Sequence, residues 1–295
     1  MMPRALRSLL LAAATAACFI GFWFGSLLLS WAILPLARLP LRRRPPIERI
    51  RRCQDVVGWG FRLFLASMRV LRLVEFRPGR VKLDLPDGPY LMIANHPTLV
   101  DVTAVMAVQP RICCVAKTEL FHSVLVGRLL RYSGHIEGGD LESLGGACVA
   151  QQALERLAGG QAVLIFPEGT RSPARGLRRF KPGVFAISIR AKVPIVPVLI
   201  TCEPPTLLKG QAWYALPKTT AAYDITQLPT VQPGALGHDA GAAAALFQRM
   251  FRERIESGSA RPSTATGIAA AALTGGLGGA MPPEPIEPWK TSRVS

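Results

Sequence analysis

A histidine and an aspartate stand five positions apart in this chain, at His96 and Asp101, directly after a short apolar run. An imidazole can accept a proton from an alcohol near neutral pH, and a carboxylate can fix which ring nitrogen does so. Aspartate is also common at helix starts, so the same spacing fits a structural pair. The spacing alone leaves a general base and a structural pair open.

A second segment has side chains that could take part in a reaction. It reads Phe-Pro-Glu-Gly-Thr-Arg-Ser at residues 166–172, about seventy positions further along. Arg171 offers a guanidinium fork for a phosphate or carboxylate, and Gly169 permits close backbone approach to a ligand. Glu168 would either accept a hydrogen bond from an acceptor hydroxyl or order the loop. Ordinary turns also use Pro-Glu-Gly, but a string of seven residues is more specific than a turn requires.

Both segments follow apolar runs that we expect to form β-strands. Strands are predicted at residues 90–94, 112–116, 162–166 and 195–200, with a further one near 221–228. Helical stretches near 99–108, 143–157, 183–191 and 242–255 alternate with them. This alternation predicts an α/β fold with a mostly parallel sheet covered by helices. Enzymes of this class place their sites at the carboxyl ends of the strands, where both segments fall.

The N-terminal part predicts membrane-associated helices. No charged residue occurs from Leu9 to Ala37, and a helix of this length can cross a bilayer. Gly21, Gly25 and Pro35 could instead bend the run into a re-entrant pair. A cleaved signal peptide is a rival interpretation, although its apolar core is usually shorter. Arginines are concentrated after the run, which predicts a cytoplasmic catalytic domain, at the inner membrane if the protein is bacterial. They are Arg38, Arg42, Arg43, Arg44, Arg49, Arg51 and Arg52.

Four regions are therefore expected along the chain. Residues 1–44 form a transmembrane or re-entrant anchor with its basic flank. Residues 45–80 contain an amphipathic helix, near 56–76, that lies in the membrane interface or faces the core. Residues 81–256 form the catalytic domain. Residues 257–295 are rich in Gly, Ala, Pro, Ser and Thr and predict a disordered tail.

The composition restricts the kinds of molecule that we expect this protein to bind. The 295-residue chain is 49% hydrophobic with a formal net charge of +16 and a mean hydropathy of +0.27. Such a chain suits an anionic membrane surface, and it carries no nucleic-acid-binding motif. Six cysteines are present without a Cys-x-x-Cys pair, so we expect reduced thiols and no metal site.

Five segments, in order and spacing, resemble the signature blocks of the glycerolipid acyltransferase superfamily, of the lysophosphatidate acyltransferase type. His96–Asp101 resembles its His-x4-Asp block, and residues 166–172 resemble its Phe-Pro-Glu-Gly-Thr-Arg-Ser block. The remaining matches are Ala116–Leu120, Phe180–Gly183 and Val193–Val198, so the resemblance covers about Pro89 to Leu199.

The resemblance implies an O-acyltransferase of phospholipid biosynthesis at a membrane. It would move a fatty acyl group from acyl-CoA or acyl-carrier protein to the hydroxyl of 1-acyl-sn-glycerol-3-phosphate, with no other cofactor and no metal. His96 would be the general base and Asp101 its partner. The implied acceptor-binding residues are Glu168, Gly169, Thr170, Arg171 and Lys117.

One segment departs from the family pattern. The family usually reads Gly-x-Ile-x-x-x-Arg in the block that begins here at Gly134, but this chain has Asp140 in place of the arginine. Losing one charge-assisted contact to a phosphate would cost on the order of 1.5–3 kcal/mol. An acceptor other than lysophosphatidate is therefore the alternative: an ornithine lipid, a glycolipid or a polyene-type lipid. A non-catalytic lipid-binding protein is a second alternative.

Overall fold

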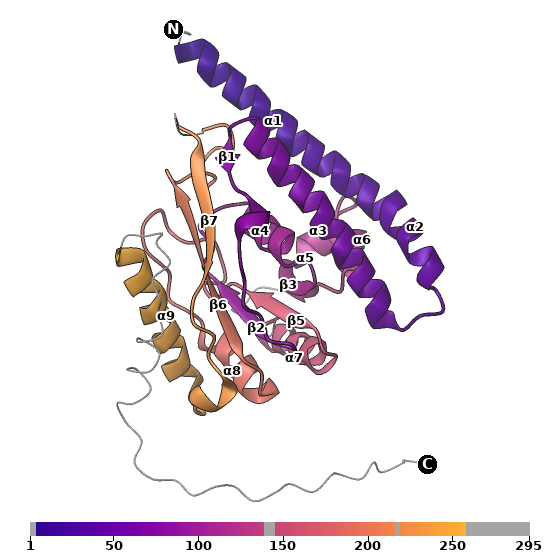
Figure 1. Ribbon diagram of the computed structural model, residues 1–295, viewed down its shortest axis with the longest axis vertical. Coiled ribbons are helices and arrows are strands. Elements are labelled where there is room, and N and C mark those ends of the chain that lie inside the picture. The colour runs from indigo at the N-terminus through magenta and orange to yellow at the C-terminus, as the bar shows by residue number, and fades with distance from the viewer. Residues whose placement is uncertain (1–3, 139–144, 216, 218, 258–295) are drawn as a thin grey trace, which may run out of the picture. The chain divides into compact units, whose positions relative to one another are not determined.

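The computed structural model describes residues 4–138, 145–215, 217 and 219–257. Within them, seven strands form one sheet in the order β1-β7-β6-β2-β5-β3-β4 (Figure 1). Strands β6, β2, β5, β3 and β4 run parallel, and β7 runs antiparallel to β6. The predicted α/β fold with a mostly parallel sheet is confirmed. The strands are β1 (Val74–Glu75), β2 (Leu91–Ala94), β3 (Ile112–Lys117), β4 (Ile136–Gly138), β5 (Ala162–Ile165), β6 (Ile195–Glu203) and β7 (Ala221–Gln227).

Helices cover both faces of the sheet, as the apolar strands require. Along β2, Met92 faces one apolar core, while Leu91 and Ile93 face the other, because successive strand residues point to opposite sides. The first core is closed by α3 (Pro46–Val70), α4 (Asp101–Val108), α5 (Thr118–His122) and α6 (Gly127–Tyr132). The second is closed by α7 (Gly145–Ala158), α8 (Pro182–Ala191) and α9 (Ala240–Glu256).

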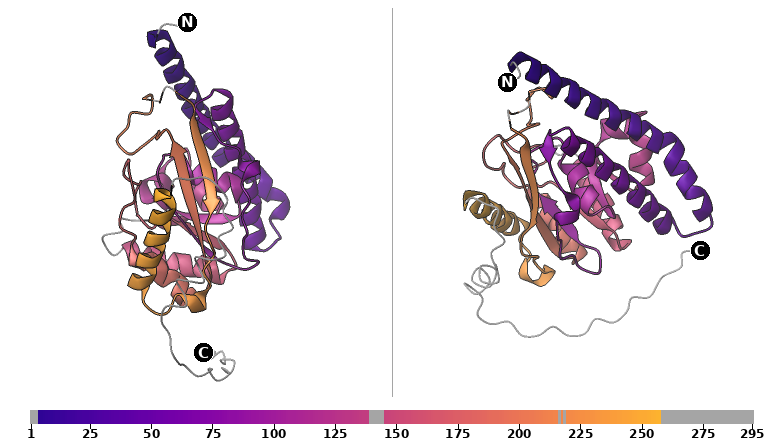
Figure 2. Two further views of the ribbon diagram at one scale, coloured as in Figure 1. Left: turned by 60° about the vertical axis from the view of Figure 1, so that its left-hand side comes forward. Right: turned by 45° about the horizontal axis from the view of Figure 1, so that its top comes forward.

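The N-terminal apolar run forms one arm of a helical hairpin. It comprises α1 (Arg4–Leu28), a π-helical turn (Leu29–Ile33), α2 (Leu34–Arg38) and a 3-10 turn (Leu39–Leu41). The chain then reverses into α3, so that α1 lies beside α3 (Figures 1 and 2). Phe22 of α1 packs on Phe64 of α3, with ring centroids 4.9 Å apart. Residues Leu9–Leu41 are long and apolar enough to cross a membrane; spanning and re-entrant insertion both remain predictions.

Helix α3 differs from the helix predicted near 56–76. It begins ten residues earlier, at Pro46. A proline in the first turn of a helix costs no hydrogen bond, so the helix can start there. Cys53, Val57 and Met68 are fully or almost fully buried, so α3 is a core helix that also carries α1. Whether its exposed arginines contact lipid remains a prediction, and the predicted tail at 258–295 lies outside the described residues.

Candidate functional site

The candidate site lies where the loops after β2 and β5 meet. These strands are neighbours in the sheet and parallel, so their carboxyl ends share one edge. The backbone N–H of Ser172 donates to the carbonyl of His96 at 2.7 Å, and the N–H of His96 donates to Ser172 Oγ at 3.1 Å. The two segments that were singled out in the sequence are therefore joined directly.

His96 and Asp101 form a hydrogen-bonded pair at this edge. Nδ1 of His96 lies 2.7 Å from Oδ2 of Asp101, whose side chain is completely buried, whereas 19% of the histidine side chain is exposed. Thr98 also donates to the carboxylate, from its backbone N–H at 2.7 Å and from Oγ1 at 2.5 Å. An ionised carboxylate only accepts hydrogen bonds, so Nδ1 donates and Nε2 keeps its lone pair. That is the tautomer that a general base needs.

The ring of His96 is also held from the second loop. Phe166 stacks on the imidazole, with centroids 4.3 Å apart and planes inclined by 26°. The ring plane is thus set by Phe166 and its rotation by Asp101. A base fixed in this way needs little reorganisation before it accepts a proton.

Tyr223 completes the hydrogen bonds to Asp101, and sequence reasoning missed this residue. Its hydroxyl, on β7, donates to Oδ1 of Asp101 at 2.7 Å. Burial, with the charge of Asp101 beside it, raises the pKa of Tyr223 well above 10.0, so the residue remains a hydroxyl donor. Burial alternates along β7, and Tyr223 is one of its buried residues. No local sequence pattern connects Tyr223 with Asp101, which lies 122 positions away.

Glu168 is a buried organiser of the second loop. It is 3% exposed. Its Oε1 accepts from Ser172 Oγ at 2.5 Å and from the His96 N–H at 3.3 Å, while Oε2 accepts from the Arg178 N–H at 2.8 Å. Of the two roles expected for Glu168, this geometry supports loop ordering. Its role in acceptor binding remains a prediction.

Gly169, Thr170 and Arg171 lie on the same loop. Gly169 has φ +71° and closes a turn by donating to the carbonyl of Phe166 at 3.0 Å, a conformation that favours glycine. Arg171 Nη1 donates to the carbonyl of Leu207 at 3.2 Å, and Lys209 Nζ lies 3.2 Å from Thr170 Oγ1. The segment after β6 therefore borders the site, which the sequence did not indicate.

Lys117 stands apart from this cluster. It ends β3, which is separated from β2 by β5, so its backbone is roughly 10 Å away across the sheet. Its side chain is exposed, and it faces the same edge as the site. Its proposed contact with an acceptor remains untested.

Other histidines lie outside the site. His135 is 3% exposed, and its Nδ1 accepts from the Cys114 N–H at 3.0 Å, so it is a packing residue. Burial, with the charge of Arg156 nearby, lowers the pKa of His135 to about 4. Among the described residues, no group of three or more His, Cys, Asp or Glu side chains could hold a metal ion. Asp140, which replaces the family's arginine, lies outside the described residues.

Comparisons with known proteins find similarity to acyltransferases. Residues 75–201 match the family model described as Acyltransferase. A 1-acyl-sn-glycerol-3-phosphate acyltransferase of Chlamydomonas reinhardtii is 32% identical over 122 residues, which cover 41% of this chain and 37% of that protein. The human 1-acyl-sn-glycerol-3-phosphate acyltransferase beta is 32% identical over 147 residues, which cover 49% of this chain and 51% of that protein. The matches thus span only about two fifths to a half of these relatives.

A solved structure shares the fold. The crystal structure of the 1-acyl-sn-glycerophosphate acyltransferase PlsC from Thermotoga maritima superposes with a TM-score of 0.61 at 20% sequence identity. The match covers 88% of this chain and all of that one. At this identity the likeness supports the fold alone.

Proposed function

We propose that this protein, whose residues 75–201 match the Acyltransferase family model, transfers a fatty acyl group from a thioester to a lipid hydroxyl. The donor would be acyl-CoA or acyl-carrier protein, and the acceptor 1-acyl-sn-glycerol-3-phosphate, the substrate named for its relatives. The observation that carries the proposal is the 2.7 Å bond between His96 Nδ1 and the buried carboxylate of Asp101.

In the proposed reaction, His96 Nε2 accepts the proton of the acceptor hydroxyl as its oxygen attacks the thioester carbonyl carbon. Asp101 stabilises the imidazolium that forms, without taking its proton. The tetrahedral intermediate then collapses with cleavage of the C–S bond. The imidazolium returns the proton to the leaving thiolate, so the products are an ester and a free thiol. Positioned proton transfer of this kind contributes roughly a hundred- to ten-thousand-fold.

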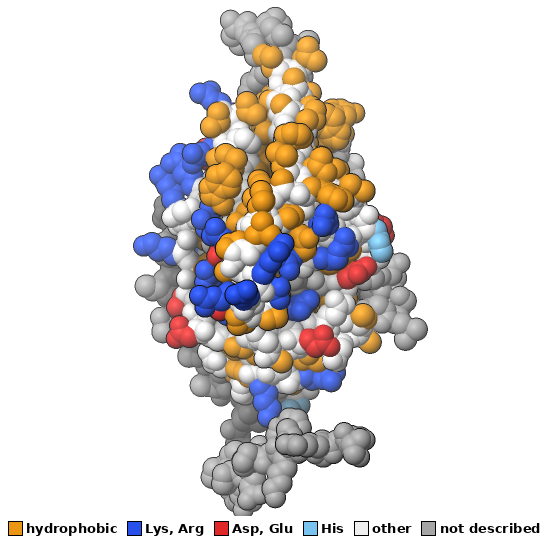
Figure 3. Space-filling view, turned by 90° about the vertical axis from the view of Figure 1, so that its right-hand side faces the viewer, with side chains coloured by type: hydrophobic (Ala, Val, Ile, Leu, Met, Phe, Trp, Pro, Cys, Tyr) orange, Lys and Arg blue, Asp and Glu red, His pale blue; other side chains and the backbone are white. Residues whose placement is uncertain are grey.

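We place the reaction at a membrane, with the N-terminal hairpin as the contact. Leu9, Ile20 and Phe24 of α1 are 61–69% exposed, and apolar side chains cover much of the hairpin face (Figure 3). A lipid acceptor would then reach the site from the bilayer without full transfer into water. A cytoplasmic position of the domain remains a prediction from the flanking arginines.

A second candidate function keeps the chemistry and changes the acceptor. Asp140 stands where the family pattern has the arginine that helps to bind the acceptor phosphate. An acceptor without a phosphate monoester, such as an ornithine lipid, a glycolipid or a polyene-type lipid, would not need that contact. Arg171 remains available as a basic group beside the site.

The test uses purified protein in lipid nanodiscs with labelled acyl-CoA or acyl-carrier protein and a panel of these acceptors. His96→Ala should reduce transfer by at least about a hundredfold, because the base is lost. His122→Ala is the matched control, since His122 is 76% exposed. Undiminished transfer by folded His96→Ala would contradict the mechanism. Turnover confined to an acceptor other than 1-acyl-sn-glycerol-3-phosphate would select the second candidate.

A further inference from the structure

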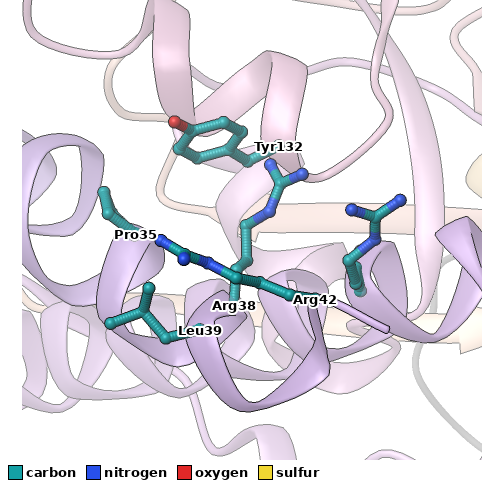
Figure 4. A pocket seen from close by; sticks show the side chains of 6 residues that line it. Pro35, Arg38, Leu39, Arg42 and Tyr132 are labelled. Carbon is teal, nitrogen blue, oxygen red and sulfur yellow. The ribbon is translucent and has the colours of Figure 1, made fainter. Parts of the chain in front are cut away.

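Three arginines surround a cavity at the closed end of the N-terminal hairpin. The cavity has a volume of about 270 Å³. It lies between α2, the 3-10 turn Leu39–Leu41, the first turn of α3 and the end of α6. In Figure 4 the side chains of Arg38 and Arg42 lie below the ring of Tyr132. The lining residues are Pro35, Arg38, Leu39, Arg42, Arg49 and Tyr132.

The positive charges of this cavity have no counter-charge in the part of the chain that the structure describes. Arg38 is placed over the Tyr132 ring, 4.1 Å from its centroid. Among the described residues, Arg38, Arg42 and Arg49 form no ion pair, and the carboxylate of Glu48 lies 4.0 Å from Arg44 instead. Nε of Arg49 is buried and has no hydrogen-bond partner within the described ranges. A buried donor beside like charges is unfavourable unless an anion binds.

The surroundings indicate what carries the anion. The apolar side chains Trp31, Ile33 and Leu36 on the same arm of the hairpin are 41–64% exposed. Figure 3 shows basic side chains gathered at the end of this apolar face. A lipid with its acyl chains along the apolar face would place its headgroup at the level of the arginines. A planar guanidinium fork matches the oxygens of a phosphate.

We propose that this cavity binds the phosphate of an anionic lipid headgroup and so fixes the depth of the hairpin in the bilayer. The cavity is separate from the candidate active site. Tyr132 precedes β4, whereas His96 follows the carboxyl end of β2. The amino end of β4 and the carboxyl end of β2 lie on opposite sides of a parallel sheet. The bound lipid is therefore neither the acceptor nor the donor of the proposed reaction.

Lipid binding is tested on detergent-solubilised protein by native mass spectrometry, without acyl donor, so the outcome does not depend on acyl transfer. Wild-type protein should retain one short-chain phosphatidylglycerol and no phosphatidylcholine of the same chain length. Free phosphate and coenzyme A carry the same chemical group without the apolar chains. Neither should displace the lipid at equal concentration. Displacement by either, or equal retention of phosphatidylcholine, would overturn the proposal without any variant.

A matched pair of triple variants locates the site. Arg38→Gln/Arg42→Gln/Arg49→Gln should bind phosphatidylglycerol at least about tenfold more weakly, because three charge-assisted contacts are removed. Arg43→Gln/Arg51→Gln/Arg52→Gln removes the same charge from exposed positions that do not line the cavity and should retain one lipid. Arg42→Gln alone, at an exposed position, repeats the test if the first triple variant unfolds. Equal weakening in the cavity and control variants would show only general charge attraction and refute the site.

Discussion

Among single residues, the carboxylate of Asp101 accepts hydrogen bonds from three residues in two parts of the chain. His96 and Thr98 come from the loop after β2, while Tyr223 comes from β7. A carboxylate with this many donors is fixed in position, so its hydrogen bond to Nδ1 controls the direction in which Nε2 points. We therefore regard Tyr223 as a positioning residue for the proposed base, although it need not touch substrate.

Tyr223→Phe tests this role. The ring packs on Phe76, 5.0 Å away, and phenylalanine keeps that contact while it removes the donor. We expect acyl transfer to fall about tenfold, the equivalent of one hydrogen bond to a charged group. The loss should fall on kcat rather than on the KM for the acyl thioester, because Tyr223 acts through Asp101 and His96. Tyr214→Phe, at an exposed position, is the control. Unchanged acyl transfer would leave Tyr223 with a packing role only.

Glu168→Gln tests the organiser of the second loop. Two carboxylate oxygens accept three hydrogen bonds here, whereas an amide has one oxygen and turns its NH₂ group toward a donor. The free energy of unfolding should fall by about 2 kcal/mol, and transfer should fall with it. Glu119→Gln, at an exposed position, is the control. It should change neither the free energy of unfolding, measured with denaturant, nor acyl transfer. A stable Glu168→Gln variant that loses transfer would instead favour direct acceptor binding.

The sequence could predict the parts of the site that are local. His96 and Asp101 lie within one loop and helix start, and Glu168 to Ser172 within one turn, so their chemistry is visible as spacing. Tyr223 and Leu207 reach the site only because β6 and β7 return to the same edge. Such contacts depend on strand order, which alternating apolar runs do not encode.

At the scale of elements, long apolar strands were predictable and short peripheral elements were not. The predictions for β2, β3, β5, β6 and β7 agree with the structure within three residues at each end. In contrast, β1 and β4 have only two and three residues, too few to show a period. The prediction for α3 started late because it followed the apolar residues and missed the arginine-rich first turns.

The contact between α3 and the segment after α4 gives a prediction at this scale. A Cβ at Gly58 would lie 2.4 Å from Pro110 Cβ, whereas one at Gly60 would meet only the Leu29 Cδ1 at 3.2 Å. Gly58→Ala should destabilise the protein by about 1–3 kcal/mol through overpacking. Gly60→Ala, in the same helix, should be neutral or stabilise by up to about 1 kcal/mol. Thermal unfolding of the two variants measures the difference, and equal midpoints would mean that α3 is free to move from Pro110.

For the whole molecule, buried ionisable groups connect stability with pH. His135 lies inside the first core, near Cys114, and its folded-state pKa of about 4 is below the value of 6.5 that it has when exposed. Between these values the unfolded chain binds a proton that the folded protein does not. The contribution of His135 to the free energy of unfolding therefore rises with pH from about 4 to 6.5 and is constant above that range.

Replacing His135 by asparagine should remove this dependence. Asparagine Oδ1 can accept the Cys114 N–H in place of Nδ1 and does not titrate. At roughly 1.4 kcal/mol per pH unit, wild-type protein should lose about 3 kcal/mol more than His135→Asn when the pH falls from 6.5 to 4. Denaturant unfolding at a series of pH values gives this difference, because all other titrating groups are common to both proteins. Parallel curves for the two proteins would mean that His135 becomes protonated in the folded state without cost, so that its burial would not control acid stability.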